Sequence, residues 1–204
     1  MPRTNRGYKR GEPHRDATLF VIACEGAVRE KEYFEHLGYE SSRIRIKVLK
    51  QGDQHKSAPK WVLDCAAKYQ SDIGLSNDDQ LWLVMDVDHW QEDHLRDINQ
   101  ACIDNAYWNL ALSNPCFEVW LYLHIDDITR SSSTTCQALK TELSQKVKGG
   151  YNCKLFIKKI REAHERALEL DPNPSKHFLP EPMRTKMHLL TADVLKIIGI
   201  NFVK

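Results

Sequence analysis

Two aspartates end a short apolar run in the middle of the chain. Leu81 to Met85 are all apolar, and Asp86 and Asp88 follow with one residue between them. A run of this length predicts a strand buried on both faces. Open α/β sheets bind ligands at the carboxyl ends of such strands, and on an extended chain the two carboxylates point the same way. Two neighbouring anions favour a divalent cation with oxygen ligands. The alternative is that the aspartates only cap the following helix.

A third carboxylate follows an earlier predicted strand. Residues 18–24, TLFVIAC, have the apolar composition of a buried strand, and Glu25 and Gly26 come directly after it. Parallel strands end at a common edge of the sheet, so Glu25 should lie close to Asp86 and Asp88 if the two strands are neighbours. The three carboxylates together can bind one or two Mg²⁺ or Mn²⁺ ions, which assist phosphoryl chemistry. Taken alone, Glu25 is more typical of a turn residue.

The elements that must position these carboxylates alternate along the chain. Residues 43–50 alternate between apolar and basic types, which predicts a half-exposed strand near a sheet edge. A fourth strand is expected over residues 107–112. The spacing of apolar residues predicts helices over 30–37, 58–69, 91–105 and 116–124. The alternation predicts an α/β fold with a parallel four-stranded sheet flanked by helices on both faces.

Composition divides the chain into three parts. We expect a basic flexible arm over 1–16, an α/β core over 17–128, and a helical C-terminal extension over 129–204 that packs on the core. The extension should contain helices over 137–147, 155–170 and 183–198. The arm is either a solvated tail or an element that contacts nucleic-acid phosphates. In the second case the contacts would come from Arg3, Arg6, Lys9, Arg10 and Arg15.

The overall composition is that of a globular protein. The chain has 204 residues, is 42% hydrophobic and carries a formal net charge of +1, which argues against a surface basic on all sides. It has no apolar run of about 18 residues and no apolar centre of a secretory signal near Met1. The six cysteines form no C-x-x-C pair. We therefore predict reduced thiols in a cytoplasmic protein that does not cross a membrane.

Several motifs, taken in order, resemble those of a known family. They are CEG at 24–26 with Glu30 and Tyr33-Phe34, MDVD at 85–88, SNPCFEVWLYLH at 113–124, Tyr151 with Lys154, and PMRTKMHLL at 182–190. Together they cover nearly the whole chain, and they resemble the RloB-like and AbiLii-like family of small Toprim-domain proteins encoded near phage-defence loci. The chain departs from the family at Arg29, where threonine is usual, so the roles of Glu30 and Glu32 stay open.

The resemblance implies a Toprim-like (Rossmann-like) fold and a metal-dependent nuclease. Such an enzyme would cut RNA, such as tRNA, or DNA as an abortive-infection effector, often with a separately encoded ATPase. The resemblance implies catalytic and metal-binding roles for Glu25, Asp86 and Asp88, with Mg²⁺ or Mn²⁺ as cofactor. It also implies an accessory set at the same sheet edge or brought toward it, consisting of Ser113, Asn114, Glu118, His124, Lys154 and His188.

Each accessory role has a simpler alternative. Glu118 near a helix start is already favoured by the helix dipole. The alternative for His124 and His188 is that they simply belong to amphipathic helices. Lys154 is either a solvated surface lysine or a residue that neutralises charge on a phosphate. The alternative for the whole protein is a non-catalytic Toprim-like module that binds an ATPase or nucleic acid. A nucleotide phosphotransferase is disfavoured because the chain lacks a G-x-x-x-x-G-K-[ST] loop. The sequence leaves the oligomeric state and the number of metals open.

Overall fold

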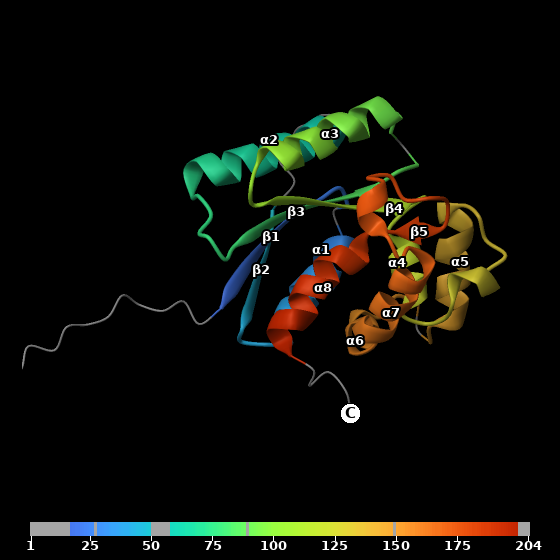
Figure 1. The fold of residues 1–204 in the computed structure, drawn as a ribbon. Helices are drawn as coiled ribbons and strands as arrows, with labels where there is room; N and C mark the ends of the chain where they lie inside the picture. Colours follow the sequence, from blue (N-terminus) through green and yellow to red (C-terminus); the bar gives the residue numbers. More distant parts are fainter. Residues whose placement is uncertain (1–16, 27, 50–57, 89, 149, 200–204) are drawn as a thin grey trace, which may run out of the picture.

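A five-stranded sheet forms the centre of the protein. The computed structural model describes residues 17–26, 28–49, 58–88, 90–148 and 150–199. The strands are β1 (Thr18–Cys24), β2 (Ile44–Val48), β3 (Gln80–Asp86), β4 (Trp108–Asn114) and β5 (Arg184–Thr185). Their order is β2-β1-β3-β4-β5, with the first four parallel and β5 antiparallel to β4 (Figure 1). The described residues therefore form an α/β fold with a mostly parallel sheet.

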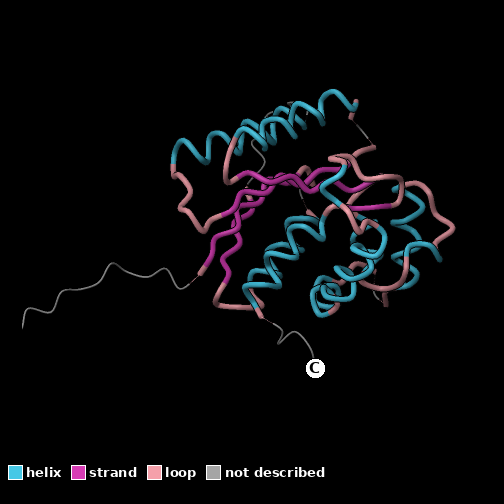
Figure 2. The backbone as a smooth tube through the Cα atoms, in the orientation of Figure 1, coloured by secondary structure: helices cyan, strands magenta, loops and turns pink. Residues whose placement is uncertain are grey.

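Helices cover both faces of this sheet. One face carries α2 (Ala58–Asp72) and α3 (Glu92–Asp104), drawn at the top of Figure 1. The helices of the other layer are α1 (Arg29–Gly38), α4 (Glu118–Leu123), α5 (Cys136–Lys146), α6 (Cys153–Lys158), α7 (Ile160–Leu170) and α8 (Met187–Ile198). Figure 2 shows the resulting three layers, with the strands between the two groups of helices.

The sheet separates two hydrophobic cores. Successive side chains of a strand point to opposite faces. Phe20 and Ile22 of β1 accordingly pack in the core with α1 and the C-terminal helices, while Val21 and Ala23 pack in the core under α2 and α3. All four are fully buried. Burial on both faces explains why β1 is a continuous apolar run rather than an alternating one.

The C-terminal helices share the core of the sheet instead of forming a separate one. Phe156 of α6 and Leu190 of α8 belong to the same buried cluster as Phe20. All six residues of α4 are buried, including Glu118. Because α4 is buried on every side, the stripe of apolar residues predicted from the sequence accounts for only one of its packed faces.

Three details of the predicted elements differ from the structure. The helix expected over 183–198 begins only at Met187, because Arg184 and Thr185 form β5. The four predicted parallel strands are present, with β2 at the sheet edge, but the sheet has a fifth strand. β5 has two residues, which is too short to produce any periodicity. The helix expected over 155–170 is two helices, because Lys159 between α6 and α7 has φ −110° and ψ 19°, outside the helical region.

The structure also pairs two of the cysteines. Cys116 and Cys136 form a disulfide, with their Cα atoms 5.9 Å apart. The prediction that all six cysteines are reduced is therefore wrong for this pair. The partners lie twenty positions apart, and only the fold brings the start of α5 against the turn before α4. The cysteines that stay free are Cys24, Cys65, Cys102 and Cys153.

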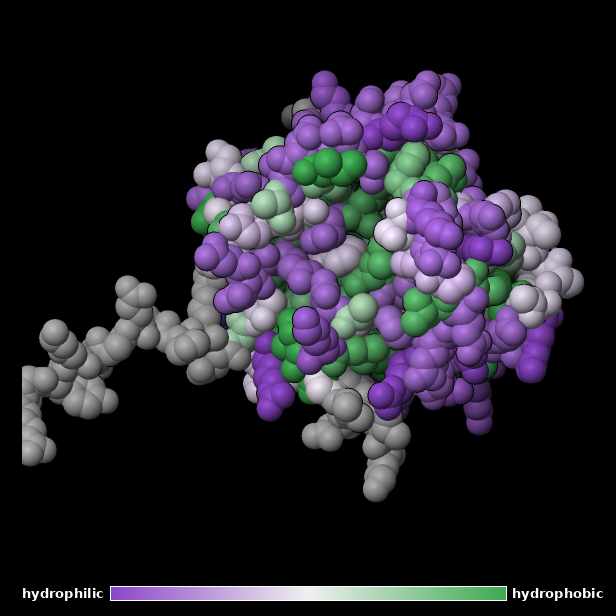
Figure 3. Space-filling view, in the orientation of Figure 1, coloured by the Kyte–Doolittle hydropathy of each residue, from purple (hydrophilic) through white to green (hydrophobic). Residues whose placement is uncertain are grey.

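The surface is mainly hydrophilic on the side shown in Figure 3, where hydrophobic residues are visible in the hollow between the upper and lower layers. Of the helices that the structure describes, none is long and apolar enough to cross a membrane. The predicted basic arm, with Arg3, Arg6, Lys9, Arg10 and Arg15, lies outside the described residues.

Candidate functional site

Glu25 and Asp86 lie at the carboxyl ends of two neighbouring strands. β1 and β3 are paired in register up to Cys24 and Val84, and the Glu25 N–H donates a hydrogen bond to the Val84 carbonyl oxygen at 3.1 Å. Between β1 and β3 the strand order changes direction, from β1 to β2 on one side and from β3 to β4 on the other. This topological switch point is where open α/β sheets commonly bind ligands.

The turn between β4 and α4 closes over the end of β3. The Phe117 N–H donates to Oδ1 of Asp86 at 2.8 Å. The N–H groups of Val87 and Asp88 both donate to the Pro115 carbonyl oxygen at 3.1 Å. These bonds hold the Asp86 carboxyl group in place and turn the chain away from the strand direction directly after it.

Four carboxyl groups form one electrostatic cluster at this edge. Burial, and to a smaller extent the nearby carboxylates of Glu30, Glu25 and Glu118, together raise the pKa of Asp86 to about 8. Burial also raises the pKa of Glu30, with Glu118 and Glu25 adding to the effect. Like charges this close disfavour full ionisation. We call Glu25, Glu30, Asp86 and Glu118 the carboxylate cluster.

Glu30 is the member that the sequence left open, and Gly26 makes room for it. A Cβ atom added at Gly26 would lie 1.8 Å from Oε2 of Glu30, so the carboxyl group of Glu30 rests directly over the glycine. Glu30 stands in the first turn of α1, which follows β1 after a short connection. A glycine directly after Glu25, four residues before a second glutamate, was the available signal for this close approach.

Two cations and an indole contact the carboxylate cluster. Nη1 of Arg29 lies 3.0 Å from Oε1 of Glu118, and Nζ of Lys140 lies 3.7 Å from the same oxygen. The Glu118 side chain is only 6% exposed, and a buried carboxylate needs such partners. The Trp90 Nε1–H donates to Oε2 of Glu25 at 3.0 Å and fixes that side chain. No motif in the sequence indicates a site role for Arg29, Lys140 or Trp90.

Asp88 lies beyond the strand. β3 ends at Asp86, so the extended geometry expected for the pair stops there, because the bonds to the Pro115 carbonyl turn the chain. The Asp88 side chain is exposed, and its Oδ2 lies 2.9 Å from Sγ of Cys136. Asp88 therefore stands at the rim formed by the disulfide, while Asp86 stands inside the cluster.

Two of the predicted accessory residues connect β4 to the segment around β5. Ser113 is opposite Asp86 in the sheet register, and its Oγ lies 2.7 Å from Oγ1 of Thr185. The Asn114 side-chain amide donates to the Pro180 carbonyl oxygen at 2.9 Å. Both contacts fasten the C-terminal segment to the end of the sheet, beside the carboxylate cluster.

The two predicted accessory histidines are both buried. Nε2 of His124 lies 3.1 Å from the Tyr33 hydroxyl, its Nδ1 lies 2.8 Å from the Trp120 carbonyl oxygen, and burial lowers its pKa to about 3. Nδ1 of His188 lies 2.9 Å from the Thr185 carbonyl oxygen, and burial lowers its pKa to about 4. Both histidines are therefore neutral at physiological pH. Lys154 lies exposed on α6.

The carboxylate cluster has the donor set of a hard divalent cation. Glu25, Glu30 and Asp86 offer only oxygen ligands, as Mg²⁺ and Mn²⁺ prefer. A cation among them would offset the mutual repulsion that raises the pKa of Asp86. The oxygen donors of these residues therefore match the ligand chemistry of the metal that the sequence motifs imply.

Comparison with known protein families shows which family the chain belongs to. A model of the RloB-like protein family matches residues 20–194. The chain belongs to the RloB-like family. No curated protein and no solved structure matches it. The segment matched by the RloB-like model contains the whole carboxylate cluster, the turn before α4 and β5.

Proposed function

We propose that this RloB-like protein is a divalent-metal-dependent nuclease. It hydrolyses phosphodiester bonds in RNA, such as tRNA, or in DNA, and acts as an abortive-infection effector against phage. The observation that carries the proposal is the carboxylate cluster, in which burial and neighbouring anions raise the pKa of Asp86 to about 8. Strongly shifted pKa values of this origin concentrate at functional sites, because a protein that did not use the charges would lose stability by keeping them.

A Toprim-like assignment of the sheet is part of the same proposal. It is supported by the order β2-β1-β3-β4 and by the position of Glu25 and Asp86 at the two central strand ends. Glu25, Glu30 and Asp86 would hold Mg²⁺ or Mn²⁺, and Asp88 would extend the site at its rim. The bound metal supplies polarisation of a phosphoryl oxygen and a water of lowered pKa.

The other groups of the site would act on the nucleic acid. Arg29 and Lys140 bring positive charge to the edge of the carboxylate cluster, where it can attract a phosphate and offset charge that develops on it. Trp90 keeps the Glu25 carboxylate oriented. We further propose that the protein acts in the cytoplasm and that a separately encoded ATPase controls it, since a nuclease effector must be held inactive before infection.

Cleavage assays with purified protein test this proposal. Labelled tRNA, single-stranded DNA and duplex DNA are incubated with Mg²⁺, Mn²⁺ or EDTA, with and without the ATPase. We expect metal-dependent cleavage that EDTA abolishes and that Glu25→Gln lowers by about 10²-fold. Glu35→Gln, on the exposed part of α1, is the matched control and should cleave like wild type. Equal cleavage by wild type and Glu25→Gln, or none by wild type on any substrate with the ATPase present, contradicts the proposal.

One observation favours a second candidate, a non-catalytic module that binds an ATPase or nucleic acid. Arg29 and Lys140 already neutralise Glu118, so part of the carboxylate cluster is satisfied within the protein. A phage plaque assay separates the two candidates. If the protein is a nuclease, the Glu25→Gln variant should lose protection against phage. A binding module should keep protection, because Glu25 is partly buried and the substitution changes little of the surface.

Substituting Gly26 tests whether the position of Glu30 matters. Gly26→Ala must displace the Glu30 carboxyl group, whose Oε2 would lie 1.8 Å from the new Cβ. A carboxyl group at the end of a flexible side chain can move, so we expect unfolding free energy to change by less than about 1 kcal/mol. Cleavage should nevertheless fall at least about tenfold, as for other displaced metal-site groups. Val28→Ala, at a side chain 70% exposed, is the control. If Gly26→Ala cleaves at the wild-type rate, the position of Glu30 does not matter for cleavage and Glu30 is not part of the site.

A further inference from the structure

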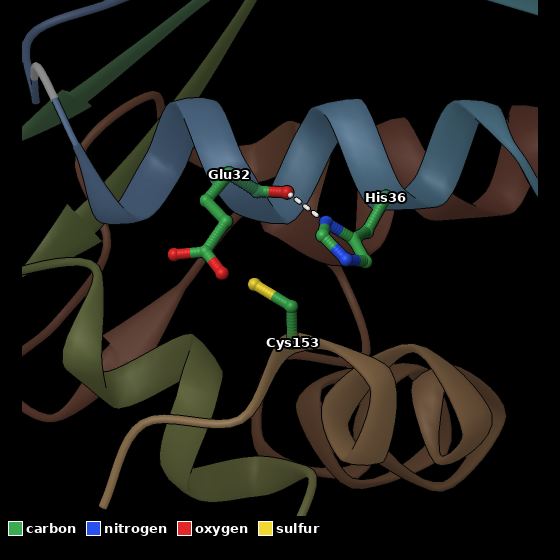
Figure 4. Close-up of side chains that lie close together, drawn as sticks. All are labelled: Glu32, His36 and Cys153. Carbon is green, nitrogen blue, oxygen red and sulfur yellow. Dashed lines mark hydrogen bonds between the residues drawn. The ribbon is translucent and has the colours of Figure 1, made fainter.

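A second group of potential metal ligands lies between α1 and α6, apart from the carboxylate cluster. It consists of Glu32 and His36 on α1 and Cys153 at the start of α6. One ligand atom from each residue lies within 4.8 Å of the other two. Figure 4 shows the Cys153 sulfur pointing up from α6 toward the side chains of α1. The three donors therefore converge from two elements that are distant in sequence.

The two residues of α1 are spaced and oriented for a common ligand. Positions i and i+4 of a helix lie on the same face, one turn apart. Nδ1 of His36 lies 3.1 Å from the Glu32 backbone carbonyl oxygen, which can only accept, so Nδ1 carries the proton (Figure 4). The lone pair is then on Nε2. Metal-binding histidines are typically oriented in this way, by a hydrogen bond from the ring nitrogen that does not bind the metal.

The sulfur of Cys153 is also held in place. Cys153 is buried, and its thiol donates to the Tyr151 hydroxyl at 2.9 Å. The Tyr151 hydroxyl in turn donates to the Arg29 carbonyl oxygen at 2.7 Å, which connects the sulfur to the first turn of α1. Burial raises the pKa of the Cys153 thiol to about 11, so the thiol is protonated at neutral pH when no cation is bound. A coordinated metal deprotonates such a thiol outright.

We propose that Glu32, His36 and Cys153 form a zinc site. Thiolate, imidazole and carboxylate are the three ligand types that Zn²⁺ uses, and water would complete the tetrahedron from the exposed Glu32 side. The charges of one thiolate and one carboxylate balance those of the cation. A thiolate disfavours Mg²⁺, so Mg²⁺ should bind the all-oxygen carboxylate cluster and not this site.

Zinc at this position would join α6 to α1. The first turn of α1 carries Arg29 and Glu30, which contact or belong to the carboxylate cluster. The zinc site would thus fix the helix that presents these residues, without itself contacting the cluster. The proposal does not depend on nuclease activity, because binding can be measured without any nucleic acid.

Metal binding to the intact protein tests the proposal. Zn²⁺ is titrated by calorimetry, and Co²⁺ is added separately while the near-ultraviolet spectrum is recorded. Oxygen is excluded and no reductant is added, so that the Cys116–Cys136 bond stays intact. With Mg²⁺ in excess to occupy the carboxylate cluster, we expect one Zn²⁺ per chain and, with Co²⁺, a sulfur-to-cobalt charge-transfer band, which the carboxylate cluster cannot produce because it contains no sulfur.

Single substitutions identify the residues that bind the metal and produce the charge-transfer band. Cys153→Ser should remove the charge-transfer band, and His36→Gln or Glu32→Gln, which change side chains outside the core, should weaken Zn²⁺ binding at least about tenfold. Cys65→Ser is the matched control, because Cys65 is a free, partly buried cysteine on α2, and it should keep the band. Absence of the band in the wild type, or its persistence in Cys153→Ser, overturns the proposal.

Discussion

Asp86→Asn is expected to stabilise the metal-free protein at pH 8 while it removes metal-dependent cleavage. Asparagine has the shape of the protonated aspartic acid and keeps an oxygen that can accept the Phe117 N–H. It removes the charge that burial, Glu30, Glu25 and Glu118 all disfavour. We expect a gain of more than about 1 kcal/mol at pH 8, because each unit of pKa shift corresponds to about 1.4 kcal/mol. Cleavage should fall by about 10²-fold or more.

The stabilisation should depend on pH in a defined direction. The pKa of Asp86 is raised from 3.8 to about 8, so between these values the native state holds a proton that the unfolded state has released. The contribution of Asp86 to stability is therefore full below pH 4 and is lost as the pH rises toward 8. Unfolding by urea in EDTA at pH 5, 6, 7 and 8 should show a gap between Asp86→Asn and wild type that widens with pH.

Adding Mg²⁺ at pH 8 should close this gap. A cation in the carboxylate cluster stabilises the ionised wild type by binding the native state alone. It should stabilise Asp86→Asn less. An Asp86→Asn protein that is less stable than wild type at every pH, with or without metal, would show that Asp86 has a structural role only.

Asp171→Ala is expected to lower the free energy of unfolding by about 3–5 kcal/mol, because it leaves a buried lysine without its counter-charge. Nζ of Lys186 lies 3.3 Å from Oδ2 of Asp171, and each side chain is only 3% exposed. Nζ also donates to the carbonyl oxygens of Pro174 and His177, so it is held in place when Asp171 is removed. For a chain of this size the loss corresponds to a melting temperature lower by about 6–20 °C.

Two further variants show that the effect comes from the buried charge. Glu92→Ala breaks the Arg96–Glu92 pair, whose side chains are 61% and 56% exposed, and should cost less than about 1 kcal/mol. The double variant Asp171→Leu with Lys186→Met removes both charges and should recover most of the stability. Calorimetry measures all three. A loss for Asp171→Ala no larger than for Glu92→Ala would contradict the proposed role of the pair.

Most of the fold could be predicted from the long apolar runs and their order along the chain. β1 and β3 are buried on both faces, so each is continuous and apolar, and the carboxylates that end them are conspicuous. Because parallel strands end at a common edge of the sheet, the placement of Glu25 and Asp86 at one edge could be predicted from the order of the elements. Their proximity also depends on the pairing of β1 with β3, which the structure shows. The basic alternation of residues 43–50 similarly indicated the exposed edge strand β2.

The features that could not be predicted from the sequence depend on contacts between residues that are distant along the chain. Lys140 reaches Glu118 from another helix, and Cys116 pairs with Cys136 across twenty positions. Neither leaves a local pattern in the sequence. The complete burial of His124 also leaves no local pattern in the sequence. The hydrogen bonds that allow its burial come from Tyr33, 91 positions away, and from the Trp120 carbonyl oxygen.

The short strand β5 has a consequence for synthesis of the protein. β5 pairs with Ser113 and Asn114 at the end of β4, and the next residue, Lys186, donates its N–H to the Leu112 carbonyl oxygen at 2.7 Å. On the ribosome, residues 184–186 emerge only after α5, α6 and α7 have been made. Until then β4 presents unpaired backbone groups at an open sheet edge, which can pair with another chain. The nascent α/β sheet is therefore exposed to mispairing until translation has passed Lys186.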